Sequence, residues 1–144
     1  MIEIFGVLVE PDVEATREVY ATFEPYRCTC SMCRNFLAAW HRVLPPSVVR
    51  VLGQLGIEPT KPHHITHFAR NSPGSHLYEV EWAFLGGVPP ALSQPAPMVK
   101  GRERNEYVGA GGIPCSQFDR SGRRCSISVN FDDVPWLIDE PEPD

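Results

Sequence analysis

The chain has 144 residues, of which 42% are hydrophobic and 22% charged, and its formal net charge is −5. This length is enough for one domain with a core of its own, without disulfide bonds. The negative charge argues against nonspecific nucleic-acid binding, and no run of about 18 apolar residues predicts a membrane-spanning segment. The odd cysteine count of five and the lack of a basic leader favour a reducing compartment, so we expect a cytoplasmic protein.

The first part of the chain predicts one strand and one helix. Residues 2–9 form a short apolar run, which is typical of a buried strand. The following Glu-Pro-Asp at 10–12 favours the start of a helix, because proline fits the first turn and acids favour its positive end. Hydrophobic residues then recur every four positions, which predicts a buried stripe that ends before Pro25. This stripe consists of Ala15, Val19 and Phe23.

Two further helices are predicted to form a hairpin. Ser31 is a suitable N-cap for a helix that runs to Val43, and the proline pair at 45–46 ends it. Ser47 is expected to cap the second helix, and Gly56 is expected to end it. The predicted buried faces are Phe36, Leu37, Trp40, Val43 and Leu44 on the first helix, and Val48, Val51, Leu52 and Leu55 on the second.

After residue 63 the hydrophobic period changes to two, which predicts strands. We expect a hairpin of strands 64–70 and 76–85 around the turn sequence at 71–74. On the second strand the large side chains alternate with smaller and acidic ones, so one face is predicted to lie in the core and the acids mostly in solvent. The predicted core face consists of His76, Tyr78, Val80, Trp82 and Phe84, and the acids are Glu79 and Glu81.

The rest of the chain predicts a second hairpin and an unpacked end. Residues 86–97 are rich in proline and are expected to be irregular, whereas strands 113–118 and 124–131 are expected to pair around 119–122. Residues 134–138 would close the core. Together these elements predict an α+β fold, with two or three short helices packed on antiparallel β-hairpins, as a single domain over residues 1–138. The acidic, proline-containing residues 139–144 are predicted to be a disordered tail that does not pack.

The most specific motif is a C-x-C-x-x-C sequence directly before the second predicted helix. In an extended segment Cys28 and Cys30 point the same way, and Cys33 follows in the first helical turn, so the three sulfurs can converge. Thiolates are preferred ligands of Zn²⁺, which binds four ligands in structural sites. We expect His76 to be the fourth ligand, because it shares the core face of its strand and lies at the strand end. His67, and then Cys115 or Cys125, are the other candidates.

Three other interpretations of the cysteines stay open. Cys30 and Cys33 form a C-x-x-C pair at a helix N-terminus, which is typical of thiol–disulfide oxidoreductases and redox sensors, although the thioredoxin-like βαβ context is not predicted. The cysteines can also be unligated structural residues. A metal-assisted hydrolase, with Glu79 or Glu81 as base, is the third alternative.

The motif also resembles a family of small uncharacterised bacterial proteins. The similarity lies in C-x-C-x-x-C-x-N-F at 28–36, in L-G-I-x-P-x-K-P at 55–62 and in Trp82 within a strand, and it spans about residues 26–88. This resemblance implies a shared design but no activity or substrate. From the cysteine motif we predict a small cytosolic binding or interaction module with a structural zinc site. An unknown protein is the kind of partner that such a module can have, whereas we expect neither nucleic acid nor membrane binding.

Overall fold

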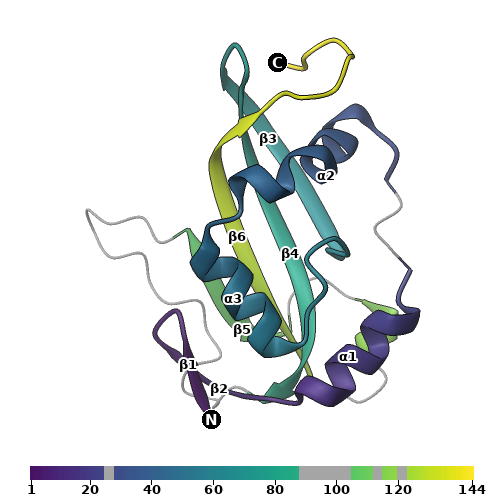
Figure 1. The fold of residues 1–144 in the computed structure, drawn as a ribbon, viewed down its shortest axis with the longest axis vertical. Helices are drawn as coiled ribbons and strands as arrows, with labels where there is room; N and C mark the ends of the chain where they lie inside the picture. The colour runs from purple at the N-terminus through teal and green to yellow at the C-terminus, as the bar shows by residue number, and fades with distance from the viewer. Residues whose placement is uncertain (25–27, 88–104, 112–114, 120–122) are drawn as a thin grey trace.

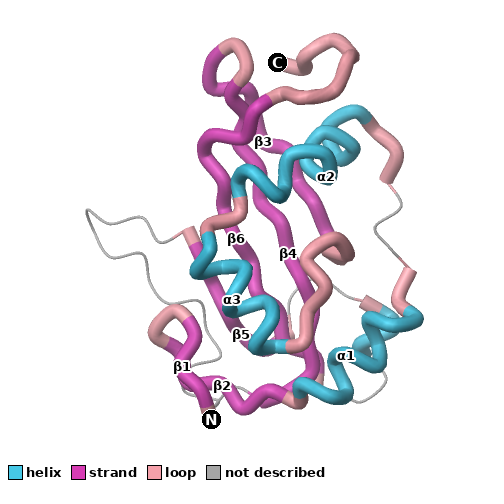
Figure 2. Tube along the Cα trace, in the orientation of Figure 1, coloured by secondary structure: helices cyan, strands magenta, loops and turns pink. Residues whose placement is uncertain are grey.

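The computed structural model describes residues 1–24, 28–87, 105–111, 115–119 and 123–144. Within these ranges it has an antiparallel six-stranded sheet and four helices, which confirms the predicted α+β class (Figures 1 and 2). The elements in chain order are β1 (Ile2–Ile4), β2 (Val7–Pro11), α1 (Val13–Thr22), α2 (Ser31–Val43), α3 (Pro46–Leu55), β3 (His64–Ser72), β4 (Ser75–Gly87), β5 (Glu106–Ala110), α4 (Ser116–Asp119) and β6 (Arg124–Pro135).

The long strand β4 organises the sheet. It pairs with β6 along one edge, and on its other edge it pairs with β3 near its start and with β2 near its end. The sheet order is β1-β2-β4-β6-β5, with β3 also paired to β4. The predicted core face of β4 is confirmed, because its five large side chains are at most 1% exposed: His76, Tyr78, Val80, Trp82 and Phe84.

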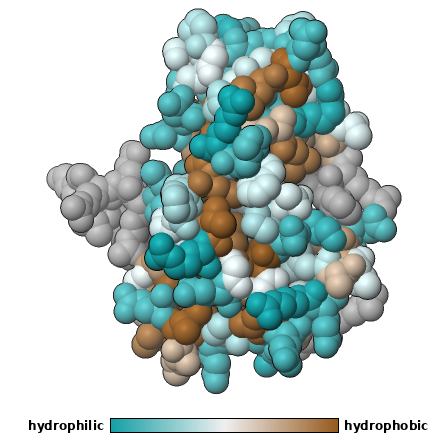
Figure 3. All heavy atoms as spheres, in the orientation of Figure 1, coloured by the Kyte–Doolittle hydropathy of each residue, from teal (hydrophilic) through white to brown (hydrophobic). Residues whose placement is uncertain are grey.

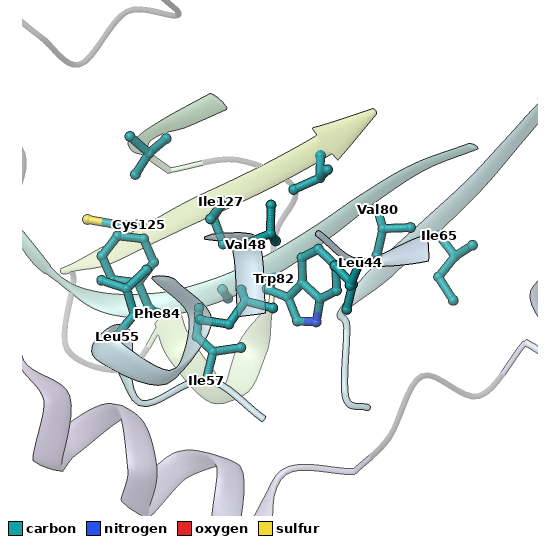
Figure 4. Close-up of a cluster of buried hydrophobic side chains, with 14 of the residues drawn as sticks. Leu44, Val48, Leu55, Ile57, Ile65, Val80, Trp82, Phe84, Cys125 and Ile127 are labelled. Carbon is teal, nitrogen blue, oxygen red and sulfur yellow. The ribbon is translucent and has the colours of Figure 1, made fainter. Parts of the chain in front are cut away.

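Helices α2 and α3 lie over one face of the sheet, and α1 lies beside the end of β4 (Figure 1). Their apolar residues meet those of β4 and β6 in one core, as the close-up in Figure 4 shows for Leu44, Val48, Trp82 and Ile127. The indole Nε1–H of buried Trp82 donates a hydrogen bond to the carbonyl of Pro59 at 3.1 Å, so the loop after α3 is fixed to the same core.

Helix α1 is fixed to β4 by polar side chains. The buried Thr16 hydroxyl accepts a hydrogen bond from the Leu85 amide at 3.0 Å, and the Tyr20 hydroxyl donates one to the Ala83 carbonyl at 2.6 Å. The innermost residues of α1 are therefore Thr16 and Tyr20, whereas Ala15 and Val19 of the predicted stripe are only partly buried.

Several predicted boundaries are wrong at the start of the chain. Residues 2–9 form two paired strands instead of one, because Phe5 and Gly6, with φ of 48° and 80°, turn the backbone between β1 and β2. The N-caps of α2 and α3 are Cys30 and Pro45 rather than the two predicted serines. The predicted end of α3 is confirmed, since Gly56 adopts the left-handed conformation with φ of 81°.

The second half of the chain also differs from the predicted hairpin. Strand β6 pairs with β5, and residues 116–119 form the short helix α4 instead of part of a strand. On β6, Ile127, Val129 and Phe131 are buried. Of the predicted irregular segment 86–97, Gly86 and Gly87 belong to β4, and the remainder lies outside the described residues.

The C-terminal residues 139–144 contact the domain, which differs from the predicted unpacked tail. Glu140 forms an ion pair with Arg34 of α2, and Asp144 lies 3.0 Å from a guanidinium nitrogen of Arg70 on β3. Charge explains the difference, because the acidic tail meets basic side chains that are far away in the sequence. The face in Figure 3 is largely hydrophilic, with hydrophobic residues gathered in an elongated central region. Among the described residues, no helix has the length and apolar character that a membrane crossing requires.

Candidate metal centre

The three cysteines of the C-x-C-x-x-C motif come together at the start of α2. Cys28 is exposed, Cys30 is half-buried and Cys33 is buried. The Cys28 and Cys30 sulfurs are 3.2 Å apart, and all three Sγ atoms lie within 4.8 Å of one another. The motif therefore forms a compact group of three sulfur atoms at the boundary between the preceding segment and the helix.

The local backbone explains why the sulfurs converge. Cys30 is the N-cap of α2, with extended backbone angles of φ −64° and ψ 157°, and its sulfur accepts a hydrogen bond from the Cys33 amide at 3.4 Å. An N-cap side chain turns back toward the first helical turn in order to reach these free amides. This turn brings Cys30 next to Cys33, and Cys28 lies beside it in the preceding segment.

The pKa values of Cys30 and Cys33 shift in opposite directions. Burial disfavours the charged form of Cys30, but hydrogen bonds from the Cys33 amide and from the thiols of Cys28 and Cys33 outweigh it and lower the Cys30 pKa. Burial, followed by the hydrogen bond with Cys30, raises the pKa of Cys33 far above its ordinary value. Cys30 is therefore more readily ionised than Cys33 in the metal-free protein, and a bound cation would be needed to stabilise a Cys33 thiolate.

Three contacts hold the first turn of α2 in place. The Tyr78 hydroxyl on β4 donates a hydrogen bond to the Met32 carbonyl at 2.7 Å. The fully buried Asn35 side chain donates to the Pro135 carbonyl at 3.0 Å and accepts from the Leu137 amide at 2.7 Å. These residues fix the helix that carries Cys33 against β4 and the end of β6.

Arg34 connects the cysteine segment to the C-terminal tail. Its Nε donates a hydrogen bond at 2.8 Å to the carbonyl of Thr29, the residue between Cys28 and Cys30. Its terminal nitrogens contact both carboxylate oxygens of Glu140. A bidentate arginine–carboxylate pair has a fixed geometry. Arg34 and Asn35 were not among the predicted site residues. Asn35 could have been found from the sequence, because it is a polar residue beside Phe36 on the predicted apolar face of the helix.

The group is suited to a metal ion. Two sulfur ligands that each lie about 2.3 Å from a tetrahedral zinc are about 3.8 Å apart. This distance lies between the 3.2 Å that separates the Cys28 and Cys30 sulfurs and the 4.8 Å within which all three sulfurs lie. Cys28, Cys30 and Cys33 are thus positioned to hold a metal ion, with three soft sulfur donors.

The structure does not bring His76, the predicted fourth ligand, into this group. Its Nδ1 lies 2.8 Å from His67 Nε2, and its Nε2 lies 2.7 Å from a carboxylate oxygen of Glu142. With Glu142 ionised, both contacts are satisfied when His76 donates its Nε2 proton to Glu142 and accepts at Nδ1 from His67. Nε2 then carries the proton and the lone pair of Nδ1 is used by His67, so neither nitrogen can bind a metal. The contact with Glu142 joins residues 66 positions apart, and the spacing of residues in the sequence does not predict it.

The remaining candidates lie in other parts of the fold. Cys115 begins the α4 region and Cys125 lies on β6, and both are buried. On β4, Glu81 is 8% exposed rather than solvated, and its carboxylate lies 2.6 Å from His63 Nε2. The Ser128 hydroxyl donates a hydrogen bond to the Glu79 carboxylate at 3.1 Å. These acids therefore have partners within the sheet region, and no described aspartate or glutamate belongs to the group of three sulfurs.

Comparison of the chain with family models, with curated proteins and with solved structures finds no match in any of the three. The resemblance of the cysteine motif to small bacterial proteins therefore stays a prediction.

Proposed function

We propose that the protein is a small binding module in which Cys28, Cys30 and Cys33 hold a zinc ion. The observation that carries this proposal is the convergence of three sulfur atoms within 4.8 Å of one another. An α-helical N-terminus favours the thiolates that a metal requires.

The role of the ion would be structural. It would join the segment of Cys28 and Cys30 to the first turn of α2, and α2 is itself fixed to the sheet through Tyr78 and Asn35. Metal affinity would then contribute directly to folding, because the unfolded chain does not hold the three sulfurs together. A module of this kind presents a surface to a protein partner and needs no catalytic residues.

A reducing compartment such as the cytosol is part of this proposal. All five cysteines are free thiols, and the Sγ atoms of three of them lie within 4.8 Å of one another, so two of these three could be oxidised to a disulfide. Thiol chemistry of this kind is maintained where glutathione and thioredoxin keep cysteines reduced.

A second candidate function is thiol–disulfide exchange. The 3.2 Å separation of the Cys28 and Cys30 sulfurs and the lowered pKa of Cys30 favour it. The Cys30 thiolate would attack one sulfur of a disulfide in another molecule, which forms a mixed disulfide and releases the other sulfur as a thiolate. A second thiol of the group would then lose its proton and attack the Cys30 sulfur, which forms an internal disulfide and releases the remaining sulfur of the other molecule, now reduced by two electrons. Cys33 is the less suitable nucleophile, because burial raises its pKa.

Metal analysis of the untagged protein distinguishes the two functions. We expect about one zinc ion per chain after purification without added metal, and removal by a chelator should lower the midpoint of thermal unfolding. Cys33→Ser should remove both the zinc and this chelator effect, whereas Cys115→Ser, which changes a buried cysteine outside the group, should retain them. A metal-free protein that loses about two hydrogens on mild oxidation would instead support thiol exchange.

A further inference from the structure

We infer that the metal at Cys28, Cys30 and Cys33 keeps one open coordination position, which accepts a neutral imidazole nitrogen from another molecule. This inference rests on the proposed metal site and specifies the ligand that completes it. It differs from a closed structural site, in which the chain supplies all four ligands.

The first argument is the inventory of donors. The chain has five cysteines and five histidines, and all ten lie in the ranges that the structure describes. Only three of them belong to the sulfur group, and no aspartate or glutamate of the described ranges joins it. The fourth ligand that zinc requires is therefore not supplied by these side chains in the folded protein.

The second argument is the direction from which a ligand can approach. Cys33 is 5% exposed and lies on the core side, where Phe36 and Tyr78 are each 1% exposed. Cys28, by contrast, is exposed. Protein atoms therefore close the Cys33 side of the group, and the open position lies on the solvent side, next to Cys28.

The third argument is charge, which determines the kind of ligand. Three thiolates and one Zn²⁺ give a net charge of about −1 at the centre. Among the described residues, Arg34 binds the Thr29 carbonyl between Cys28 and Cys30, but it already forms a bidentate pair with Glu140, so it supplies little positive charge for a further anion. A fourth thiolate or a carboxylate would raise the negative charge, whereas a neutral imidazole leaves it unchanged and is a preferred zinc donor.

The imidazole can come from a small molecule or from a histidine of a second copy of this chain, since the coordination chemistry is the same. Of the five histidines, His41 in the last turn of α2 is the one that is exposed, and it is available to a neighbouring molecule. These two sources differ in their effect on the association state.

Cobalt(II), which reports its coordination through visible absorption bands, is a suitable probe. The protein is loaded with one equivalent of Co²⁺, and imidazole is then added. We expect the bands to shift to one plateau with a one-site dependence, while an equal concentration of acetate leaves them unchanged. Cys115→Ser should behave like the native chain, and Cys28→Ser should lose the cobalt spectrum or change it before imidazole is added.

The outcomes separate this inference from the proposed function. In the monomeric cobalt protein, bands that appear but do not respond to imidazole, or that respond to acetate or a thiol instead, would overturn the open imidazole position and leave the metal site intact. Failure to bind Co²⁺ and Zn²⁺ would remove the metal site and this inference together. Sedimentation of the zinc-loaded protein identifies the source, because a histidine of a second copy predicts a dimer that imidazole dissociates, whereas a small-molecule source predicts a monomer throughout.

Discussion

Asn35 shows how one buried polar side chain can position a site. It is fully buried, yet its amide group donates to the Pro135 carbonyl and accepts from the Leu137 amide. Both partners lie where the chain leaves β6, about 100 residues later in the sequence. The Asn35 side chain therefore supplies hydrogen-bond partners to two backbone groups at the end of the sheet, and these bonds hold α2 against that end.

Asn35→Ala is expected to lower the free energy of unfolding by about 1–3 kcal/mol, because it leaves a buried amide and a carbonyl without partners. Urea denaturation measures this change. Asn71→Ala is the matched control, since the Asn71 amide donates one hydrogen bond to the Asp132 carbonyl in an exposed position. A loss at Asn35 no larger than that at Asn71 would contradict the positioning role.

At the scale of elements, the end of α3 depends on a glycine. Gly56 has φ of 81°, and a Cβ atom built on it would lie 2.7 Å from the Val13 carbonyl oxygen of α1. Such a contact is far too short, and the neighbouring atom belongs to the backbone, so it cannot turn away. The same residue thus ends α3 and permits the close approach of α1.

Gly56→Ala should therefore destabilise the protein by about 1–3 kcal/mol, through both the left-handed backbone and the contact with α1. Gly53→Ala is the control on the same helix, because a Cβ there meets nothing within 4 Å. Alanine is the better helix former, so that variant should gain about 0.5–1 kcal/mol. Thermal unfolding of the two variants would reveal opposite shifts, and equal shifts would disagree with this account of α3.

At the scale of the whole molecule, the acidic tail joins parts of the fold that are distant in sequence. Glu142 contacts His76 on β4 and accepts a hydrogen bond from the Gly74 amide in the β3–β4 turn, and Glu140 reaches Arg34 beside the cysteines. The ring of Trp136 packs on His76, with 5.0 Å between the centroids. The tail therefore covers His76 and connects the hairpin end to the helix that carries the metal centre.

This arrangement predicts a dependence of stability on pH. The hydrogen bond from His76, followed by that from the Gly74 amide, lowers the pKa of Glu142 from its ordinary value of 4.5. A carboxylate with a lowered pKa stabilises the folded state above its ordinary pKa, and this contribution is lost as the pH falls through the folded-state value. Glu142→Gln should consequently be less stable than the native chain at pH 7, and the difference should close as the pH falls below about 4.5.

Urea midpoints measured between pH 3 and pH 8 are the appropriate test of the tail contacts (about five points suffice for a single titration). Glu3→Gln, which changes an exposed glutamate on β1, should follow the native chain over the whole range. A difference between Glu142→Gln and the native chain that persists unchanged in acid would show that the ionised Glu142 is not what stabilises this end of the molecule.

The sequence by itself determined the features that depend on neighbouring residues. Hydrophobic period predicted the core face of β4, the proline pair at 45–46 predicted the end of α2, Gly56 predicted the end of α3, and the C-x-C-x-x-C spacing predicted that three sulfurs converge. Each of these depends on side-chain direction or on backbone preference over a few positions, which local sequence specifies.

Only the tertiary structure decided which distant groups meet. It gave β6 the partner β5 in place of residues 113–118, and it placed Glu142 on the ring nitrogen of His76 that a metal would need. It also buried Asn35 between α2 and the end of β6. The physical reason is that hydrogen bonds and ion pairs between segments depend on their separation in space, and the order of residues in the chain does not fix that separation.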